Sequence, residues 1–502
     1  MNSSEMLAFN GRKYPEREAV IGMGRRITWK ELDRETDQLA NALKSRGLGG
    51  GDKIALFMPN VPEFVTAYFA VQRIGAVVVP LNVKLAGAEL EYILRDAGAS
   101  GIIAHELVFE AVRGVTGPDV KIKTGAPEAG WEGYSEVLRA AGDDPVRCSL
   151  PEEAESTILY TSGTTGKPKG VLFSCRNILT VSRMMCTEFE MKPDSRLLIM
   201  MPLSHSAPLH LFLMAGVTVG AALVLTPTFT PDLLLSTVEE ERTTHFFGAP
   251  VAYLLTAGHP GIGEADLSSM KWWVYGSAPL SAPEVRKVQQ TFRTDNLVCV
   301  YGLTEAGPSG TLMFGPEHAD KAGSIGRRAA LYAEVRIVDD EGRDAAPGEV
   351  GEIVLRGEGT MIGYHNNEEA TAATFLEDGW LKTGDLAKFD EDGYIWVVDR
   401  KKDLIISGGV NIYPKEIEEA ILSYPGMRET AVIGVPHPEW GETVKAVYAS
   451  DSPVAVEELK AHLGGLLAKY KIPRLYEQLE ELPRNASGKI LKQVLKERVE
   501  TV

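Results

Sequence analysis

Apolar and polar positions in the first 80 residues predict helices that are each followed by a strand. The segment ITWKELDRETDQLANALKSRGLGGGDKIALFMPN has the spacing of a capped amphipathic helix, then a glycine stop, then a short apolar run. The next segment, VPEFVTAYFAVQRIGAVVVPLN, repeats this order. Continuous apolar runs such as VVVPL are typical of strands covered on both faces, as in parallel sheets. The pattern therefore predicts an α/β fold with doubly wound sheets.

The pattern changes in the last third of the chain. Residues 323–399 are rich in strand and turn signals, and EVRIVDDEGRDAAPGEVGEIVLRG resembles a hairpin, so we predict a β subdomain there. Beyond residue 399 the chain becomes a compact mix of helix and strand patterns, and the charged run DRKKD would on charge alone be a solvated turn. We place a domain boundary here. This predicts a large N-terminal domain of residues 1–399 and a small α+β C-terminal domain of residues 400–502.

Length and charge narrow the class of protein. A chain of 502 residues is too long for one ordinary core, so at least two folded units are expected. The 52 Lys and Arg residues are outnumbered by 69 Asp and Glu residues, and the net charge of −17 argues against a mainly electrostatic nucleic-acid or lipid partner. The four cysteines lack zinc or disulfide spacing, which suits a reducing compartment. Because the first residues show no export signal, we expect a cytoplasmic protein.

One uncharged stretch requires a test for a membrane span. Residues 197–231 contain no Asp, Glu, Lys or Arg. Proline, serine and histidine residues interrupt its first half, and the remainder is shorter than the ~20 apolar residues that a bilayer requires. We therefore predict a buried helix followed by a buried strand, and no transmembrane segment.

The strongest chemical signal is ILYTSGTTGKPKG, residues 158–170. An apolar, strand-like lead runs into a loop of hydroxyl side chains, glycines and two lysines, which is suited to holding polyphosphate. The loop is not a Walker A motif, because Thr161 stands at the place of the first glycine and Pro168 follows Lys167. A flexible surface loop would explain TSGTTG alone, but the whole string is far less expected by chance.

The string resembles the phosphate loop of the acyl-adenylate-forming superfamily, and in particular of its acyl-CoA synthetase (fatty-acid:CoA ligase) branch. Further motifs of that family follow in order, namely YGLTEAG, TGDLA, DRKKDLIISGGVNIYPKEIE and PRNASGKILK. The resemblance runs from ITWKEL to the end of the sequence. It implies an AMP-forming acid–thiol ligase that uses ATP, Mg²⁺ and coenzyme A as co-substrates.

The same resemblance assigns the nucleotide site. The residues concerned are Thr161, Ser162, Gly163, Thr164, Thr165, Gly166, Lys167, Gly276, Ser277, Ala278, Pro279, Tyr301, Gly302, Thr304, Asp385 and Arg400. Their chemistry agrees, because Tyr301 offers a flat face for a purine and Asp385 two oxygens for the ribose hydroxyls. Without the resemblance, YGLTEAG would be a turn with a core tyrosine, and Asp385 a helix cap or an Asx turn.

Three residues are predicted to be catalytic. Thr304 offers a hydroxyl to a phosphate oxygen, and Glu305 offers a hard carboxylate to Mg²⁺ as the metal ligand. Lys489 of PRNASGKILK would by itself be a solvated surface lysine. When a carboxylate attacks the α-phosphate of ATP, however, two anions are forced together, and a bridging lysine offsets their repulsion in the transition state. We therefore predict this role for Lys489.

The resemblance also implies that the C-terminal domain moves. Lys402 stands at the hinge position of the family, and Gly408 and Gly409 belong to a loop that lines the channel for the pantetheine arm of CoA. Rotation at the hinge would let one domain serve both half-reactions. From the residues alone, the two glycines are a turn between strands.

The acyl pocket is predicted to include His205 and Gly248. His205 matches a histidine that lines the acyl site in the family, whereas Ser204 replaces a frequent aromatic residue. The aspartate that amino-acid adenylating domains use to pair with a substrate ammonium is absent. The uncharged residues 197–231 and the run FFGAPVAYLL favour an apolar acid tail, so we predict a medium- or long-chain fatty acid.

Several alternatives stay open. The acid could be an aryl acid, or a dicarboxylic acid if Arg286 or Lys271 faces the pocket. The acceptor could be a carrier-protein thiol, or the chain could be a nucleotide-binding protein without catalysis. The sequence also does not decide whether the chain forms a homodimer.

Overall fold

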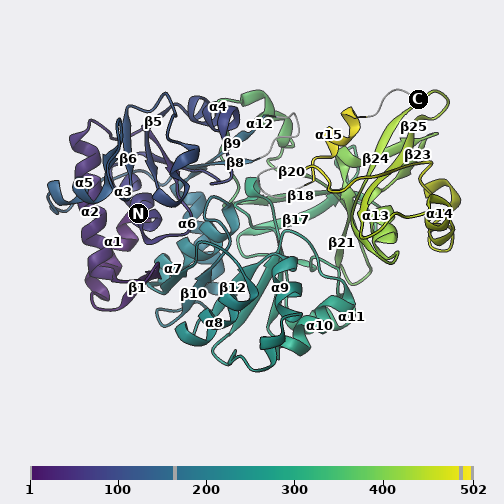
Figure 1. The fold of residues 1–502 in the computed structure, drawn as a ribbon, viewed down its shortest axis with the longest axis horizontal. Helices are drawn as coiled ribbons and strands as arrows, with labels where there is room; N and C mark the ends of the chain where they lie inside the picture. Colours follow the sequence, from purple (N-terminus) through teal and green to yellow (C-terminus); the bar gives the residue numbers. More distant parts are fainter. Residues whose placement is uncertain (1–2, 162–166, 485–489, 499–502) are drawn as a thin grey trace. The chain divides into compact units, whose positions relative to one another are not determined.

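The computed structural model of the chain describes residues 3–161, 167–484 and 490–498, which belong to two compact units (Figure 1). The first unit comprises Met1–Val335 and Leu355–Leu381, and the second comprises Arg336–Val354 and Lys382–Val502. This division does not test the boundary predicted between residues 399 and 400, nor the hinge at Lys402, and both stay predictions.

The first unit contains a nine-stranded sheet whose central strands are parallel. Six neighbouring strands, β14, β13, β12, β10, β11 and β1, pair in parallel, and antiparallel strands lie at both edges. In sheet order the strands are β16 (Arg328–Ala329), β15 (Thr311–Met313), β14 (Leu297–Tyr301), β13 (Trp272–Gly276), β12 (His245–Gly248), β10 (Arg196–Ile199), β11 (Ala222–Leu225), β1 (Glu18–Gly22) and β2 (Arg25–Thr28).

A second sheet of eight strands belongs to the same unit. Six of its strands, from β8 to β7, pair in parallel, whereas β9 is antiparallel to both of its neighbours. In sheet order the strands are β19 (Gly363–Tyr364), β9 (Lys169–Ser174), β8 (Glu155–Thr161), β4 (Val77–Pro80), β3 (Lys53–Phe57), β5 (Ala99–Ala104), β6 (Val120–Lys123) and β7 (Glu132–Gly133). The prediction of an α/β fold with largely parallel sheets is confirmed.

Helices connect these strands. They are α1 (Ser3–Lys13), α2 (Trp29–Ser45), α3 (Pro62–Arg73), α4 (Gly87–Ala97), α5 (Tyr134–Ala140), α6 (Cys175–Glu188), α7 (Met214–Val219), α8 (Pro231–Glu241), α9 (Pro250–Ala257), α10 (Ala282–Phe292), α11 (His318–Lys321) and α12 (Glu368–Thr374). The predicted cap of α2 is present, because Thr28 Oγ1 accepts from Glu31 N while Glu31 Oε2 accepts from Thr28 N. The order α2, β3, α3, β4 is the one that the sequence predicts.

Most of the uncharged residues 197–231 are buried in the core of the first unit. β10 is followed by a π-helical segment (Ala207–Leu213), then by α7 and the buried strand β11. The prediction of a buried helix and strand is thereby confirmed. Among the residues that the structure describes, none of the helices combines the length and the apolar character needed to span a bilayer.

The predicted β subdomain appears as a four-stranded sheet. Its strands in order are β17 (Ala333–Val338), β18 (Gly351–Gly357), β20 (Leu381–Phe389) and β21 (Ile395–Arg400). β17 and β18 are neighbours, as the hairpin-like sequence predicts. The division between the compact units falls within β17, β18 and β20.

The second unit is a mixed sheet with helices, as predicted. Its strands are β22 (Ile405–Ser407), β23 (Val410–Ile412), β24 (Met427–His437), β25 (Gly441–Ser450) and β26 (Leu475–Gln478), and its helices are α13 (Pro414–Leu422), α14 (Val456–Gly464) and α15 (Lys492–Glu497). Alternate residues of β24 belong to two different apolar clusters. Val432 packs with Ile417 and Leu459, whereas Ile433 packs with Leu495 of α15. Both faces of the sheet are therefore covered.

A buried charged network joins the first three helices. Arg73, at the end of α3, is 2% exposed, and its guanidinium lies 2.7 Å from Asp37 Oδ1 and 2.8 Å from Asp33 Oδ1 of α2. Its Nε donates to Ser4 Oγ of α1 at 3.0 Å. In Figure 1 these helices lie at the purple end of the unit. Because a buried charge is costly unless it is paired, the network fixes α1, α2 and α3 against one another.

Replacing the arginine should destabilise the first unit. Arg73→Met keeps most of the side-chain volume but removes the closest cation from the buried Asp37. Its other partners within the described part of the chain are Val146 N–H and the more distant Arg147 at 3.4 Å. We expect the free energy of unfolding to fall by about 3 kcal/mol. Urea unfolding followed by tryptophan fluorescence would measure this loss.

The matched control is an exposed ion pair. Arg176 lies 2.5 Å from Glu153, and both side chains are largely in water. Arg176→Met should change the free energy of unfolding by less than about 0.5 kcal/mol. Equal losses in the two variants would contradict a special role for the buried network.

Candidate functional site

The predicted phosphate loop connects two antiparallel strands. β8 and β9 pair from Glu155 and Ser174 to Thr161 and Lys169, so the connection leaves the eight-stranded sheet at Thr161. Thr161 and Lys167 lie within the described residues, whereas Ser162, Gly163, Thr164, Thr165 and Gly166 lie outside them. Two ammonium groups near the loop lie over aromatic rings. Lys167 Nζ is 5.7 Å from the ring centre of Tyr92, and Lys169 Nζ is 4.9 Å from that of Tyr364.

Three other predicted segments begin at the carboxyl ends of neighbouring parallel strands. Gly248 ends β12, Gly276 ends β13 and Tyr301 ends β14. The register pairs Gly248 with Tyr275 and Gly276 with Val300, so these strand ends are level. In open α/β sheets, ligands bind outside the carboxyl ends of the strands. The structure therefore brings the predicted adenine wall, the purine-stacking tyrosine and one acyl-pocket residue to one edge.

The GSAP segment turns sharply at this edge. A Cβ added to Gly276 would lie 2.7 Å from Val300 O, which explains the glycine. Ser277 has φ 72°, a left-handed conformation that costs a residue with a side chain on the order of 1 kcal/mol. Ala278 and Pro279 follow it and lead towards α10. Backbone held in a strained conformation is typical of ligand sites.

The TEA turn (Thr304–Ala306) follows β14 directly. Thr304 Oγ1 lies 3.1 Å from Ser206 Oγ, and Glu305 Oε1 accepts a hydrogen bond from Tyr364 OH at 2.9 Å. Gly302 is required, because a Cβ there would lie 2.2 Å from Pro308 O. Sequence reasoning identified Thr304 and Glu305 but not Ser206 and Tyr364.

His205 lies in the loop after β10. Burial lowers its pKa, and the charge of Lys84 lowers it further, so the imidazole is neutral near pH 7. Burial also lowers the pKa of His210 to about 4. His210 packs edge-on against Phe173 of β9, with 4.9 Å between ring centres. The next residue, Ser206, lies within hydrogen-bonding distance of Thr304 in the TEA turn, so His205 lies next to a residue that contacts this turn.

The predicted ribose residues meet in the second unit. Asp385 of β20 pairs with Arg400 of β21, and Arg400 Nε lies 2.7 Å from Asp385 Oδ1. Asp385 is buried and Arg400 is about half exposed. Such a pair fixes the orientation of the Asp385 carboxylate, because one of its oxygens faces the guanidinium of Arg400. The two residues lie together, as a shared role in binding requires.

The predicted hinge and CoA loop also belong to the second unit. Lys402 lies in an exposed 3₁₀ turn (Lys401–Asp403). Its neighbour Lys401 lies 2.8 Å from Asp340 and 3.1 Å from Glu352, and these contacts raise the pKa of Lys401. Gly408 and Gly409 connect β22 to β23 with φ 58° and 80°. Two successive left-handed residues form a tight hairpin turn, so the turn interpretation of ISGG is correct.

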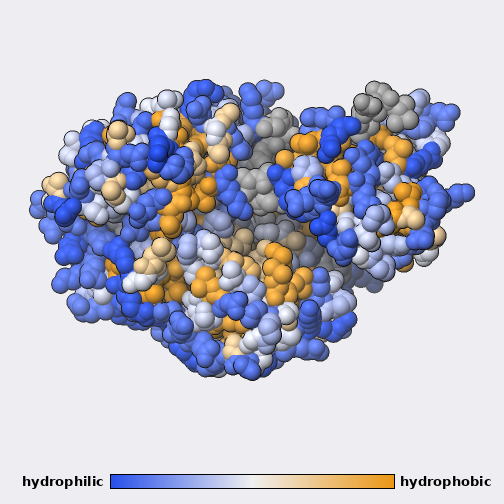
Figure 2. Space-filling model, viewed as in Figure 1, coloured by the Kyte–Doolittle hydropathy of each residue, from blue (hydrophilic) through white to orange (hydrophobic). Residues whose placement is uncertain are grey.

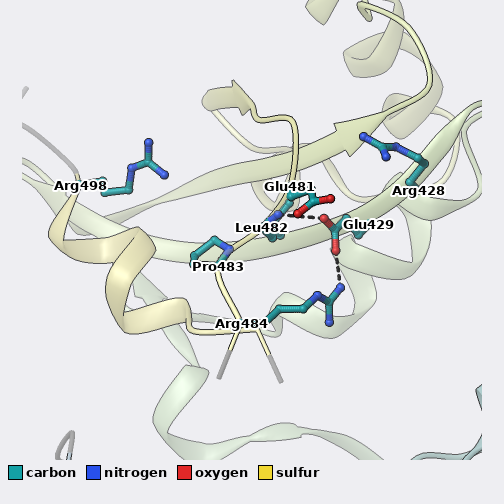
Figure 3. Close-up of a pocket in the computed structure, with 7 residues that line it drawn as sticks. All are labelled: Arg428, Glu429, Glu481, Leu482, Pro483, Arg484 and Arg498. Carbon is teal, nitrogen blue, oxygen red and sulfur yellow. Dashed lines mark hydrogen bonds and ion pairs between the residues drawn. The ribbon is translucent and has the colours of Figure 1, made fainter. Parts of the chain in front are cut away.

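Lys489 lies outside the described residues, but the base of its loop is described. Leu491 N donates to Pro483 O at 2.8 Å, and Arg484 forms a β-bridge with Ile490, so the two ends of the loop are held together. Glu429 of β24 accepts from Leu482 N at 2.8 Å and pairs with Arg484, as the dashed lines in Figure 3 show. Burial opposes ionisation of Glu429, but these hydrogen bonds outweigh it and lower its pKa.

A pocket of about 700 Å³ lies beside this loop base. It is lined by Arg428, Glu429, Glu481, Leu482, Pro483, Arg484 and Arg498 (Figure 3). Only Pro483 and Arg484 belong to the PRNASGKILK motif, and none of the lining residues is a predicted site residue. The ion pair of Glu429 and Arg484 thus connects the motif to β24.

The residues of the TEA turn suit a magnesium nucleotide. Glu305 supplies a carboxylate oxygen, the ligand type that Mg²⁺ prefers, and Thr304 supplies a hydroxyl for a phosphate oxygen. Among the described residues, no three His, Cys, Asp or Glu side chains gather into a metal cage. Mg²⁺ is commonly held by one or two carboxylates together with substrate phosphates. Glu305 would be the protein ligand here.

Comparisons with known proteins identify the family of the chain. The model of the AMP-binding enzyme family matches residues 7–365, and that of the AMP-binding enzyme C-terminal domain matches residues 416–489. The chain is 39% identical to a feruloyl-CoA synthase of Amycolatopsis sp over 97% of both chains, and 34% identical to the long-chain-fatty-acid–CoA ligase FadD13 of Mycobacterium tuberculosis over 94% of this chain and 93% of that one.

Solved structures of related enzymes have the same fold. ATP-bound MatB from Rhodopseudomonas palustris superposes with a TM-score of 0.88 over 99% of both chains, at 30% identity. These likenesses confirm the predicted family and the predicted fold, with its large N-terminal and smaller C-terminal parts. They also confirm the predicted class of enzyme and its co-substrates ATP, Mg²⁺ and coenzyme A. The chain therefore belongs to the AMP-binding enzyme family and is an AMP-forming acid–thiol ligase.

Proposed function

We propose that the chain activates a carboxylic acid with an uncharged body and joins it to the thiol of coenzyme A. The observation that carries the proposal is the arrangement at the strand ends of the first unit. Thr304 and Glu305 follow β14, beside the adenine-wall segment after β13 and Gly248 at the end of β12. A nucleotide and an acid can meet at such an edge.

In the first half-reaction, a carboxylate oxygen of the acid attacks the α-phosphorus of ATP, and pyrophosphate leaves. Mg²⁺, when bound, neutralises charge on the phosphates. Glu305 would hold it, Thr304 would donate to a phosphate oxygen, and Lys489 would offset the repulsion between the two anions. In the second unit, Asp385 accepts from the ribose hydroxyls while Arg400 holds it by their 2.7 Å contact. Tyr301 stacks on the purine.

In the second half-reaction, the sulfur of CoA attacks the carbonyl carbon of the acyl-adenylate, and AMP leaves. No covalent enzyme intermediate is needed. Rotation at Lys402 withdraws Lys489 and brings Gly408 and Gly409 to the acyl-adenylate, where a tight backbone turn leaves space for the pantetheine arm. The domain that moves is then residues 400–502.

The identity of the acid is a choice between two classes. Our argument for a fatty acid used the uncharged residues 197–231, but the structure buries most of them in the core, so their lack of charge follows from packing. In FFGAPVAYLL, Val251 and Leu255 of α9 are 61% and 54% exposed, and Figure 2 shows an apolar patch over this helix. An aryl acid is therefore a second candidate, which the 39% identity to a feruloyl-CoA synthase favours.

A dicarboxylic acid has less support. The two residues considered for a second carboxylate, Arg286 and Lys271, are both exposed in the first unit. Exposed cations bind a carboxylate weakly because water and salt screen them. Neither residue supplies a buried partner for a second negative charge.

A panel of acids tests the function directly. Fatty acids of graded length, cinnamate-type and indole acids, and dicarboxylates would be offered with ATP and Mg²⁺, and pyrophosphate release measured with and without CoA. We expect one apolar class to give a rate at least 100-fold above the others, with AMP release that requires CoA. If no acid in the panel causes exchange of labelled pyrophosphate into ATP, the proposed function is wrong.

Lys489→Ala should separate the half-reactions. Acid-dependent pyrophosphate release should fall at least 100-fold, the equivalent of about 3 kcal/mol in the barrier, which is the scale of a lost oxyanion donor. Thioester formation from supplied acyl-AMP should be largely retained, because that step does not need this lysine. The control Lys496→Ala, on the helix that follows the loop, should leave both rates near wild type. Equal loss of both steps in Lys489→Ala would refute the assignment.

Lys402→Pro should affect the opposite step. Proline fixes φ near −65° and so restricts the backbone change that a hinge needs. We expect adenylation to be retained and transfer to CoA to slow by at least tenfold in single-turnover measurements. Lys402→Ala keeps the backbone free and should slow neither step. A normal second step in the proline variant would count against the hinge.

A further inference from the structure

Residues 361–365 connect two parts of the candidate site by backbone hydrogen bonds. Met361 N donates to the carbonyl of Glu305 at 2.8 Å, Ile362 N to Leu172 O at 2.9 Å, and His365 N to Gly170 O at 2.7 Å. The strand β19 within this segment pairs with β9, the strand that leaves the phosphate loop. Residues 361–365 therefore hold the turn that bears Glu305 against the strand that follows the phosphate loop.

The side chain in the middle of this segment reaches Glu305 itself. Tyr364 OH donates to Glu305 Oε1 at 2.9 Å. The phenol hydroxyl is the donor in this contact, because an ionised carboxylate can only accept a hydrogen bond. Lys169 Nζ lies over the ring of Tyr364, 4.9 Å from its centre. The tyrosine is thus fixed by its backbone pairing and by contacts of its ring and hydroxyl.

This geometry matters for a metal ligand. Mg²⁺ demands near-ideal octahedral geometry with short bonds to oxygen, so a carboxylate that can rotate freely is a poor ligand. A carboxylate held through one oxygen presents the other in a defined direction. Groups that orient metal ligands in this way commonly change metal affinity by 10- to 100-fold when they are removed.

We propose that Tyr364 is a positioning residue for the magnesium nucleotide, because its hydroxyl holds Oε1 of Glu305 and orients the carboxylate towards the cation. The inference rests on the proposed function, since it takes Glu305 as the magnesium ligand. In this proposal Tyr364 acts through Glu305 and not by direct contact with ATP or the acid. Its effect is on how strongly Mg²⁺ improves the binding of ATP.

The test is the ratio of the ATP dissociation constants without and with Mg²⁺, measured by isothermal titration calorimetry in the absence of acid. Tyr364→Phe removes only the hydroxyl. We expect this ratio to fall about tenfold, while ATP binding in EDTA stays within twofold of wild type. A ratio equal to that of wild type would overturn the inference. So would an equal loss of ATP affinity with and without Mg²⁺, because that would indicate a general disturbance of the site.

The matched control is Tyr68, a tyrosine elsewhere in the first unit. Tyr68 is fully buried and its hydroxyl lies 2.8 Å from Thr157 Oγ1, so Tyr68→Phe also removes one buried phenol hydroxyl and its hydrogen bond. The ratio should be unchanged in this variant. A fall as large as that in Tyr364→Phe would show that any lost buried hydroxyl has the effect, and would overturn the inference.

A double-mutant cycle shows whether Tyr364 acts through Glu305. In a Glu305→Gln background, where the carboxylate ligand is absent, adding Tyr364→Phe should not change the ratio further. A second tenfold fall would mean that the tyrosine acts independently and would overturn the inference. Failure of the proposed function is distinguishable, because the wild-type chain would then give no pyrophosphate exchange with any acid of the panel, a result that does not depend on the ATP-binding ratio.

Discussion

The candidate site depends on close contact between backbone segments around the TEA turn. A Cβ at Gly302 would lie 2.2 Å from Pro308 O, and one at Gly307 would lie 2.2 Å from Gly359 O. Real side chains cannot approach backbone so closely, so both glycines are required where they stand. Gly307 also has φ 85°, which favours glycine for a second reason. Thr304 and Glu305 lie between these two contacts, so their side chains leave a backbone that has little freedom to shift.

The proposed nucleotide residues fall into two groups, each of which lies within one of the two units. Thr304 and Glu305 belong to the first unit and are held by Ser206, Tyr364 and the backbone contacts. Asp385 and Arg400 belong to the second, where they hold each other. Contacts within one unit thus hold each group. Under the proposed mechanism, a rotation between the two steps leaves the contacts of Thr304 and Glu305 intact.

Features that depend on local interactions could be predicted from the sequence, whereas features that depend on contacts between distant residues could not. The order α2, β3, α3, β4 was predictable because helical spacing, caps and apolar runs are local signals. Thr304, Glu305, Asp385 and Arg400 were predicted as site residues from short motifs, which are also local signals. Tyr364 was not, because its contact with Glu305 spans 59 residues and depends on the pairing of β19 with β9. The uncharged residues 197–231 were interpreted as pocket lining, although a buried core requires the same composition.

The charge of the protein sets a final constraint on how the reaction is promoted. A net charge of −17 repels ATP and CoA at long range, so their binding has to come from donors in direct contact. At physiological ionic strength, exposed charges are largely screened beyond about 8 Å. Under the proposed mechanism, Lys489 therefore stabilises the crowded anions only when its domain brings it into contact, and its effect disappears once that domain rotates. Under this mechanism, an acidic protein can assist adenylation without retaining AMP after the thioester has formed.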